Sequence, residues 1–376
     1  MTSVLFSPFT LKNIILPNRF VMPAMQRGHC VDGAPAPELA DYYRRRAEGE
    51  VGLIIGESCA VDHPTATGQT TAGRLTRATM PGWKACIDAV HSAGGHMLVQ
   101  LWHEGAIREA VDGNTISPSG LAYPGRSNGR AASADELAEI REAFVSSACL
   151  AREIGADGVE IHACHGYLLD QFLWAGTNSR DDGYGGRDIT QRARLPAEIV
   201  AGIRAACGED FLISFRMSQW KEAAYEAVIV ESPEELRILT DLLAQAGVDL
   251  FHASTRRFWQ AEWEGDARGF AGWTKALSGL PTIAVGSVGL EQDVMSAILD
   301  GAESAQKAEA SIVELERRLG AGEFDLVAVG RSLIGDPDWV RKVREGRYDA
   351  IRPFRRSDLG SLGWNLDIVH EAHGSR

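Results

Sequence analysis

Two histidines and a tyrosine stand close together in one short segment, and their side chains could polarise and protonate a carbonyl compound. His162, His165 and Tyr167 follow the run Gly158–Ile161, whose alternating apolar residues are typical of a strand that breaks into a loop. Two imidazoles can both donate a hydrogen bond to one oxygen, and a nearby phenol can deliver a proton. We therefore predict that His162, His165 and Tyr167 form a catalytic group.

Two other interpretations of these residues stay open at this point. The histidines could be packed in an ordinary loop, without any chemistry. They could also bind zinc together with Glu160 or Asp170. No second histidine pair or His-x-His pattern supports a zinc site, so we predict that the protein holds no metal.

Length and composition limit the classes of function. The chain has 376 residues, of which 45% are hydrophobic, and a net charge of −13. This charge argues against nucleic acid or an anionic membrane surface as a partner. No apolar run approaches the roughly 20 residues that cross a bilayer, no signal peptide is evident, and the six cysteines are scattered. We expect a cytoplasmic protein with free thiols that acts on a small molecule. Whether it forms a homo-oligomer stays open.

Short apolar runs alternate with longer helical patterns along most of the chain. Near-continuous apolar runs are typical of parallel strands that are buried on both faces. Strands that are each followed by a helix predict an α/β fold. The predicted architecture is a closed (β/α)8 TIM barrel, and a doubly wound open sheet is the alternative. The predicted strands are Phe20–Met22, Leu53–Ile55, Met97–Gln100, Gly158–His162, Phe211–Arg216, Asp249–His252, Thr282–Val285 and Leu326–Val329.

Other segments complete the predicted domain. Residues Leu5–Arg19 are typical of a hairpin that plugs one end of the barrel. The Gly-, Ser- and Pro-rich segment Gly105–Ala132 is a candidate lid, and Glu291–Leu319 predicts an enlarged helical insertion late in the barrel. We expect residues 1–376 to form a single domain, with 352–376 as a C-terminal extension. Further helices are predicted at Glu38–Ala47, Pro81–Ala93, Gln191–Ala206 and Asp338–Glu345, and after the start signals Ser133–Glu136 and Ser232–Glu235.

Polar residues follow nearly every predicted strand. In a barrel the carboxyl ends of the strands share one rim, so these residues predict a small-molecule site. Gly286-Ser287 and Gly330-Arg331 are typical of a phosphate site, because glycine lets backbone N–H groups approach an anion closely. Arg216 ends an apolar strand and requires an anionic or strongly polar partner. Gln100 offers a donor and an acceptor, which suits an amide-like edge such as a flavin pyrimidine ring.

These residues, taken together, resemble the old yellow enzyme family of FMN-dependent ene-reductases. The similarity extends from about Leu5 to about Arg347. The fourth-strand motif with its Tyr-Gly-Gly continuation is the most specific part. The matching segments are Pro17–Phe20, Gln100–His103, His162–Leu173, Asn178–Arg187 and Gly330–Pro337.

The resemblance implies a non-covalent FMN at the barrel mouth and NAD(P)H as the reductant. His162 and His165 would bind the carbonyl oxygen of the substrate, Tyr167 would be the proton donor, and Gln26 and Trp102 would contact the substrate. The residues implied for FMN are Pro23, Ala24, Met25 and Ser58 along the flavin ring, Gln100 and Arg216 at its pyrimidine edge, and Gly286, Ser287, Gly330 and Arg331 at its phosphate.

The resemblance also implies a ping-pong reduction of the C=C bond in α,β-unsaturated carbonyl compounds. Alternatives on the same scaffold are oxidative demethylation, ring dehydrogenation and the reduction of aromatic thioesters or nitro compounds, and a flavin-free lyase or aldolase is a further class. Gln26 departs from the family, which usually has Thr or Cys there, and Ala24 replaces a usual Pro. The sequence lacks the cysteine-rich cluster motif of larger relatives such as dienoyl-CoA reductases, so we expect a stand-alone reductase.

Overall fold

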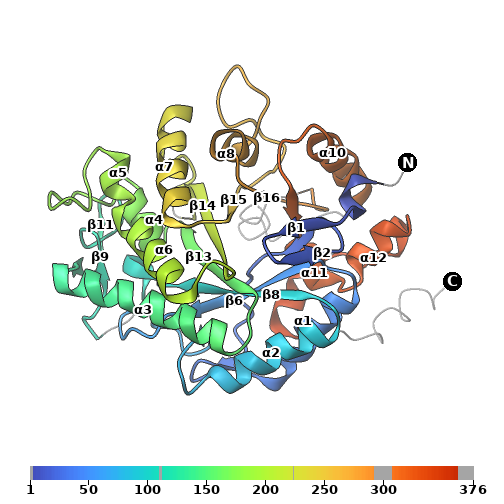
Figure 1. The fold of residues 1–376 in the computed structure, drawn as a ribbon, viewed down its shortest axis with the longest axis horizontal. Coiled ribbons are helices and arrows are strands. Elements are labelled where there is room, and N and C mark those ends of the chain that lie inside the picture. The colour runs from blue at the N-terminus through green and yellow to red at the C-terminus, as the bar shows by residue number, and fades with distance from the viewer. Residues whose placement is uncertain (1–2, 110–111, 223, 292–306, 363–376) are drawn as a thin grey trace.

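Eight parallel strands close into a barrel in the computed structural model, which describes residues 3–109, 112–222, 224–291 and 307–362 (Figure 1). The first barrel strand pairs with both the second and the last, which closes the ring and excludes the open doubly wound sheet. The barrel strands are β3 (Phe20–Met22), β6 (Leu53–Ala60), β8 (His96–Trp102), β13 (Gly158–His165), β14 (Leu212–Lys221), β15 (Leu250–Ser254), β16 (Thr282–Val285) and β17 (Leu326–Ala328).

Amphipathic helices surround the barrel and bury their apolar faces against it (Figure 1). Helix α3 begins at a capping box, as predicted, in which Ser133 and Glu136 each accept a backbone hydrogen bond from the other. The helices are α1 (Pro37–Glu48), α2 (Met80–Ser92), α3 (Ala134–Glu153), α4 (Leu168–Leu173), α5 (Ile189–Arg192), α6 (Arg194–Cys207), α7 (Pro233–Ala246), α8 (Phe270–Ser278), α10 (Ala308–Gly320), α11 (Arg331–Gly335) and α12 (Trp339–Arg344).

The N-terminal hairpin closes the amino end of the barrel, as the sequence predicts. Strands β1 (Phe9–Leu11) and β2 (Ile14–Leu16) pair antiparallel around Lys12 and Asn13. Leu11, Ile14 and Leu16 pack in one buried cluster with residues from the first half of the barrel strands. The hairpin therefore fills the end of the barrel that lies opposite the predicted site.

The segment Gly105–Ala132 forms short ladders beside α4. In its described residues β9 (Ile116–Ser117) pairs with β12 (Arg130–Ala131), and β10 (Leu121–Tyr123) pairs with β11 (Arg126–Ser127). None of the described residues in this segment lines the cavity described below, so we do not retain the lid interpretation. The remaining short elements are η1 (Val4–Phe6), β4 (Cys30–Val31), β5 (Ala34–Pro35), β7 (Gly73–Arg74), η2 (Gly105–Ile107), η3 (Tyr348–Ala350) and η4 (Arg356–Gly360).

Two further segments differ from their predictions or lie partly outside the described residues. The helix predicted at Gln191–Ala206 is interrupted at Ala193, which ends α5 and precedes α6. The insertion predicted at Glu291–Leu319 contains α10, but residues 292–306 lie outside the described residues. In the predicted C-terminal extension, η4 contacts α11, and residues 363–376 lie outside the described part of the chain.

Candidate functional site

A cavity of about 440 Å³ opens at the carboxyl ends of the barrel strands. Every side chain or glycine that the sequence analysis assigned to the site lines this one cavity, although these residues come from distant parts of the chain. The cavity is of the size expected for a small-molecule or cofactor site. The predicted residues that line it are Pro23, Ala24, Met25, Gln26, Ser58, Gln100, Trp102, His162, His165, Tyr167, Arg216, Gly286, Ser287, Gly330 and Arg331.

Other residues of the cavity wall were missed by the sequence analysis. Ser254 is the last residue of β15, two positions after the predicted end of that strand. Trp220 and Glu222 belong to the wall because β14 continues to Lys221, well past its predicted end at Arg216. The position of Ser254, a polar residue at the end of an apolar run, is the signal that could have identified it. The residues missed are Gln69, Trp220, Glu222, Ser254, Thr255, Arg256, Val285, Val288, Leu290 and Ala328.

His162, His165 and Tyr167 lie together at one side of the cavity. The ring centroids of the two histidines are 5.6 Å apart, and the Tyr167 ring is 5.0 Å from that of His162. Trp102 meets the other side of Tyr167 edge to face, with 5.3 Å between ring centroids. The three groups predicted to act on one carbonyl compound are therefore close enough to contact the same small molecule.

Burial keeps both imidazoles neutral. Removal from water, reinforced by the positive charge of Arg216, lowers the pKa of His162 to about 3 and that of His165 well below its ordinary value. Burial likewise raises the pKa of Tyr167, with a further contribution from Glu222. At neutral pH the cavity thus holds two neutral imidazoles and a protonated phenol, all of which can donate hydrogen bonds.

An irregularity in β13 turns the second histidine into the cavity. The pairing of β13 with β14 shifts register between Ala163 and His165, and His165 has a φ of 64°. Ser218 Oγ accepts a hydrogen bond from the backbone N–H of His165 at 3.1 Å. A left-handed backbone is costly for a residue other than glycine, so the surrounding contacts must hold His165 in place.

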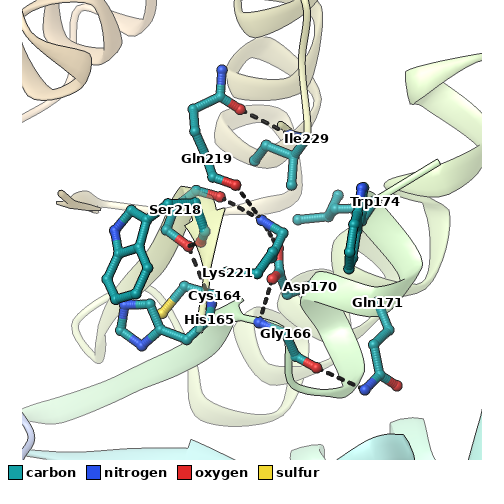
Figure 2. A network of polar contacts seen from close by, with 12 residues as sticks. Cys164, His165, Gly166, Asp170, Gln171, Trp174, Ser218, Gln219, Lys221 and Ile229 are labelled. Atoms are coloured by element: carbon teal, nitrogen blue, oxygen red, sulfur yellow. Dashed lines mark hydrogen bonds and ion pairs between the residues drawn. The ribbon is translucent and has the colours of Figure 1, made fainter. Parts of the chain in front are cut away.

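A buried ion pair holds the loop that follows His165. The Asp170 carboxylate accepts a hydrogen bond from the Gly166 N–H at 2.6 Å, and its other oxygen lies 2.9 Å from Lys221 Nζ. The Lys221 ammonium also donates to the carbonyl oxygens of Ser218 and Gln219, at 3.0 and 2.6 Å. Figure 2 shows how this pair joins the end of β14 to α4. Both charged groups are fully buried, and the pair fixes the segment between His165 and α4.

A second polar network lies beneath the cavity floor and is organised by Glu160. Its carboxylate accepts hydrogen bonds from Gln100 Nε2 at 2.7 Å and Ser214 Oγ at 3.0 Å, and it lies 2.8 Å from His252 Nδ1. Burial alone would raise the pKa of Glu160, but His252 and Arg216 lower it to about 2. Ser58 Oγ donates to Gln100 Oε1 at 2.5 Å. These contacts fix the orientation of the Gln100 amide at the cavity wall.

The cavity wall fits a planar, polar-edged cofactor with a phosphate. Arg216 Nε is buried and has no hydrogen-bond partner among the described residues, and the Nη contacts to Ala24 O and Ser254 Oγ are long, at 3.5 and 3.4 Å. A buried guanidinium with an unused donor can bind an anionic or carbonyl-rich edge of a cofactor. At Gly286, where φ is 154°, a Cβ atom would lie 2.7 Å from Thr255 Oγ. A side chain at this position would clash with the Thr255 segment, so the turn requires glycine.

Three groups near Tyr167 could also contact a metal ion. One ligand atom each from His162, Cys164 and His165 lies within 4.8 Å of the others. Burial raises the pKa of the Cys164 thiol well above its ordinary value, which disfavours the thiolate that a metal requires. The positive charges of Arg216 and Lys221 lower the pKa of this thiol, but the effect of burial outweighs them. Our prediction that the protein holds no metal therefore stays a prediction.

The barrel and its cavity define the class of protein: a (β/α)8 barrel with a cofactor-sized site at the carboxyl rim. The family described as NADH:flavin oxidoreductase / NADH oxidase matches residues 4–350, and the chain belongs to this family. The predicted resemblance to old yellow enzymes is thereby confirmed. The structure of morphinone reductase in complex with tetrahydroNAD is similar, with a TM-score of 0.78 and 28% identity over 94% of this chain and 93% of that one.

Curated relatives agree with the family assignment. The "NADH oxidase" of Thermoanaerobacter brockii is 34% identical over 96% of this chain but only 53% of its own length. The "NADPH dehydrogenase" of Halalkalibacterium halodurans is 29% identical over 91% of this chain and 94% of its own length. The "12-oxophytodienoate reductase 7" of Oryza sativa is 34% identical over 55% of this chain and 56% of its own length. This chain thus spans about half the length of the first relative and nearly all of the second.

The matching family is one of flavin redox enzymes. The cofactor of this family is FMN, and the names of its members point to NADH or NADPH as the reductant. Membership of this family favours flavin redox chemistry over a flavin-free lyase or aldolase. Within the described residues, no helix is both long enough and apolar enough to cross a membrane.

Proposed function

We propose that the protein reduces the C=C bond of α,β-unsaturated carbonyl compounds at the expense of NAD(P)H. The observation that carries this proposal is the convergence of His162, His165 and Tyr167 on one cavity, each able to donate a hydrogen bond or a proton. The names of two similar proteins, morphinone reductase and 12-oxophytodienoate reductase 7, also describe reductases. These names support the reaction class and leave the substrate of this chain open.

The cavity residues divide by the part of FMN that each would contact. Gln100 and Arg216 would bind the pyrimidine edge, where the unused Arg216 Nε donor is available. Gly286, Ser287, Gly330 and Arg331 would hold the phosphate, and Pro23, Ala24, Met25 and Ser58 would line the ring. When bound, FMN supplies a hydride donor and acceptor at the centre of the cavity.

The remaining residues act on the substrate. His162 and His165 donate hydrogen bonds to its carbonyl oxygen, which draws electrons from the conjugated alkene and makes the β-carbon accept hydride. Tyr167 donates its phenolic proton to the α-carbon, so that one hydride and one proton complete the reduction. Gln26 and Trp102 contact the substrate from the cavity wall. Burial suits this task. It lowers the pKa of both imidazoles, so they donate hydrogen bonds but do not take the proton from Tyr167.

The shape of the site supports one order of reaction. All of the predicted substrate and cofactor residues line one cavity, so we propose that NAD(P)H and the alkene occupy the same space in turn, which is a ping-pong order.

The barrel strands close within residues 20–328, and this supports the prediction that the chain forms one FMN-binding unit.

A variant at Tyr167 tests the proposal. With NADPH or NADH and 2-cyclohexenone under anaerobic conditions, the wild-type protein should form cyclohexanone. Tyr167→Phe should lose this turnover by about 10²-fold, the usual size of a general-acid contribution, and keep the reduction of its flavin by NAD(P)H. Cyclohexanone is measured by gas chromatography, and flavin reduction by the loss of visible absorbance. No product from the wild-type protein, or full turnover by Tyr167→Phe, would contradict the proposal.

A further inference from the structure

Each histidine of the pair has one ring nitrogen bonded to a neighbouring side chain. Ser254 Oγ lies 2.8 Å from Nε2 of His165, and Cys164 Sγ lies 3.1 Å from Nδ1 of His162. Ser254 and Cys164 are both buried, and Cys164 precedes His165 directly in β13 (Figure 2). A neutral imidazole carries a single N–H, so the group at one nitrogen decides whether the other nitrogen donates or accepts.

The contacts of Ser254 fix the direction of its hydrogen bonds. Arg216 Nη2 lies 3.4 Å from Ser254 Oγ, and a guanidinium can only donate, so the serine oxygen must accept from it. Among the described residues, the Ser254 hydroxyl has no acceptor other than Nε2 of His165. We infer that the hydroxyl hydrogen points at Nε2, its one acceptor among the described residues, which places the imidazole proton on Nδ1.

The environment holds this arrangement in place. Trp220 packs against the His165 ring at a tilt of 36°, with 4.7 Å between ring centroids, and its indole N–H donates to the Ser254 carbonyl oxygen at 3.2 Å. The Nδ1–H form is the less common tautomer of a free neutral imidazole. A donor at Nε2 is thus required for His165 to offer an N–H from Nδ1.

The thiol of Cys164 acts in the same way on the other histidine. Burial raises the pKa of Cys164 and lowers that of His162, so the thiol keeps its proton and the imidazole is neutral. The S–H can then donate to Nδ1 of His162, which places the imidazole proton on Nε2. Both rings line the cavity, and in both the hydrogen lies on the nitrogen that has no partner among the described residues.

We propose that Ser254 and Cys164 are positioning residues, which set the tautomers of His165 and His162 so that both imidazoles donate to one substrate oxygen. This inference rests on the proposed function and adds residues that do not touch the reacting atoms. The opposite tautomer would turn a lone pair toward the oxygen and replace an attraction with a repulsion. Ser254 carries the greater effect, because His165 must be held in the less common tautomer.

The test compares Ser254→Ala with Ser254→Thr, which restores a hydroxyl, and with Ser147→Ala, which removes another buried serine hydroxyl that lies far from the cavity. The first readout is the dissociation constant of a para-substituted phenol in the FMN-bound protein. Ser254→Ala should weaken phenol binding and slow enone reduction by about tenfold each, the value of one lost hydrogen bond. Ser254→Thr should regain most of both, and Ser147→Ala should change neither.

The second readout is the tautomer itself, from nitrogen NMR shifts of protein labelled with ¹⁵N-histidine, in which His165→Asn identifies the signals of His165. We expect Nδ1–H in the wild-type protein and Nε2–H in Ser254→Ala. Cys164→Ala should weaken phenol binding by a smaller factor. The inference is overturned if wild-type His165 carries its proton on Nε2, or if Ser254→Ala binds phenol like the wild-type protein. If the wild-type protein neither binds phenols nor reduces enones, the proposed function fails instead.

Discussion

The charge state of the histidine pair depends on burial, and burial therefore links the chemistry of the site to the stability of the protein. A protonated imidazole beside Arg216 would be repelled by the guanidinium and would have lost its hydration. The same environment that keeps His162 and His165 as neutral hydrogen-bond donors thus makes folding sensitive to acid.

This sensitivity can be measured at His162. In the unfolded chain its pKa is close to 6.5, whereas in the folded protein burial lowers it to about 3. Between these values the unfolded state binds a proton that the folded state does not, so stability is full above about pH 6.5 and falls as the pH drops. The slope is about 1.4 kcal/mol per pH unit, or about 2 kcal/mol between pH 7.5 and 5.0.

His162→Asn should remove this contribution. Between pH 7.5 and 5.0, its free energy of unfolding should fall by about 2 kcal/mol less than that of the wild-type protein. The measurement is the urea midpoint of the FMN-bound protein at pH 7.5 and 5.0. His29→Asn, which alters a partly exposed imidazole outside the cavity, serves as the control and should behave like the wild-type protein. Equal acid sensitivity of His162→Asn and the wild-type protein would show that His162 is not kept neutral by burial.

At the scale of elements, the geometry of the site depends on the junction of β13, α4 and β14. His165 occupies a left-handed backbone conformation, and the loop after it is held by Asp170 and Lys221. Neither charge has access to water, so each depends on the other and on the polar backbone groups around it (Figure 2). The pair thus connects the ends of two strands through the helix that follows Tyr167.

Removing one partner of this pair should be more harmful than replacing both. Asp170→Asn leaves the Lys221 charge buried without a counterion and should lower the free energy of unfolding by about 3–5 kcal/mol. The double variant Asp170→Leu/Lys221→Met should recover much of this loss, because no charge is left unpaired. Urea unfolding gives the three values. Glu234→Gln, which breaks the exposed pair of Glu234 with Arg237, should have little effect.

An Asp170→Asn protein as stable as the wild type would mean that the ion pair does not hold this junction. Flavin content and phenol affinity report on the cavity in the same variants. We expect Asp170→Asn to weaken phenol binding, since Gly166 would lose a carboxylate acceptor between His165 and Tyr167.

The sequence predicts which strands and helices are present, but it does not predict where some of them end. All eight barrel strands lie where the apolar runs predict them. The polar continuation of β14 to Lys221 has no apolar pattern and depends on pairing with β13 and on the burial of Lys221 against Asp170. For this reason Trp220 and Glu222 were missed. The break at Ala193 is explained by Pro196, which has no N–H to donate to the Arg192 carbonyl oxygen four residues earlier, a signal that the predicted helix passed over.

At the scale of the whole molecule, the barrel explains why a site could be predicted from scattered residues. Parallel strands that close into a ring bring their carboxyl ends to one rim, so a polar residue at each strand end predicts a common cavity. The assigned residues lie around that cavity. Contacts that depend on three-dimensional register could not be foreseen. Glu160 joins Gln100 to His252, and Ser254 joins Arg216 to His165, across neighbouring strands.

We expect the rim of the barrel to hold FMN beside two hydrogen-bonding imidazoles. The most direct measurement is a visible spectrum of the purified protein with FMN, before and after addition of a para-substituted phenol. The flavin absorbance should gain a long-wavelength charge-transfer band, because a phenolate held by His162 and His165 would stack on the flavin. A protein that remains colourless after incubation with FMN, or a flavin spectrum that saturating phenol does not change, would contradict this expectation.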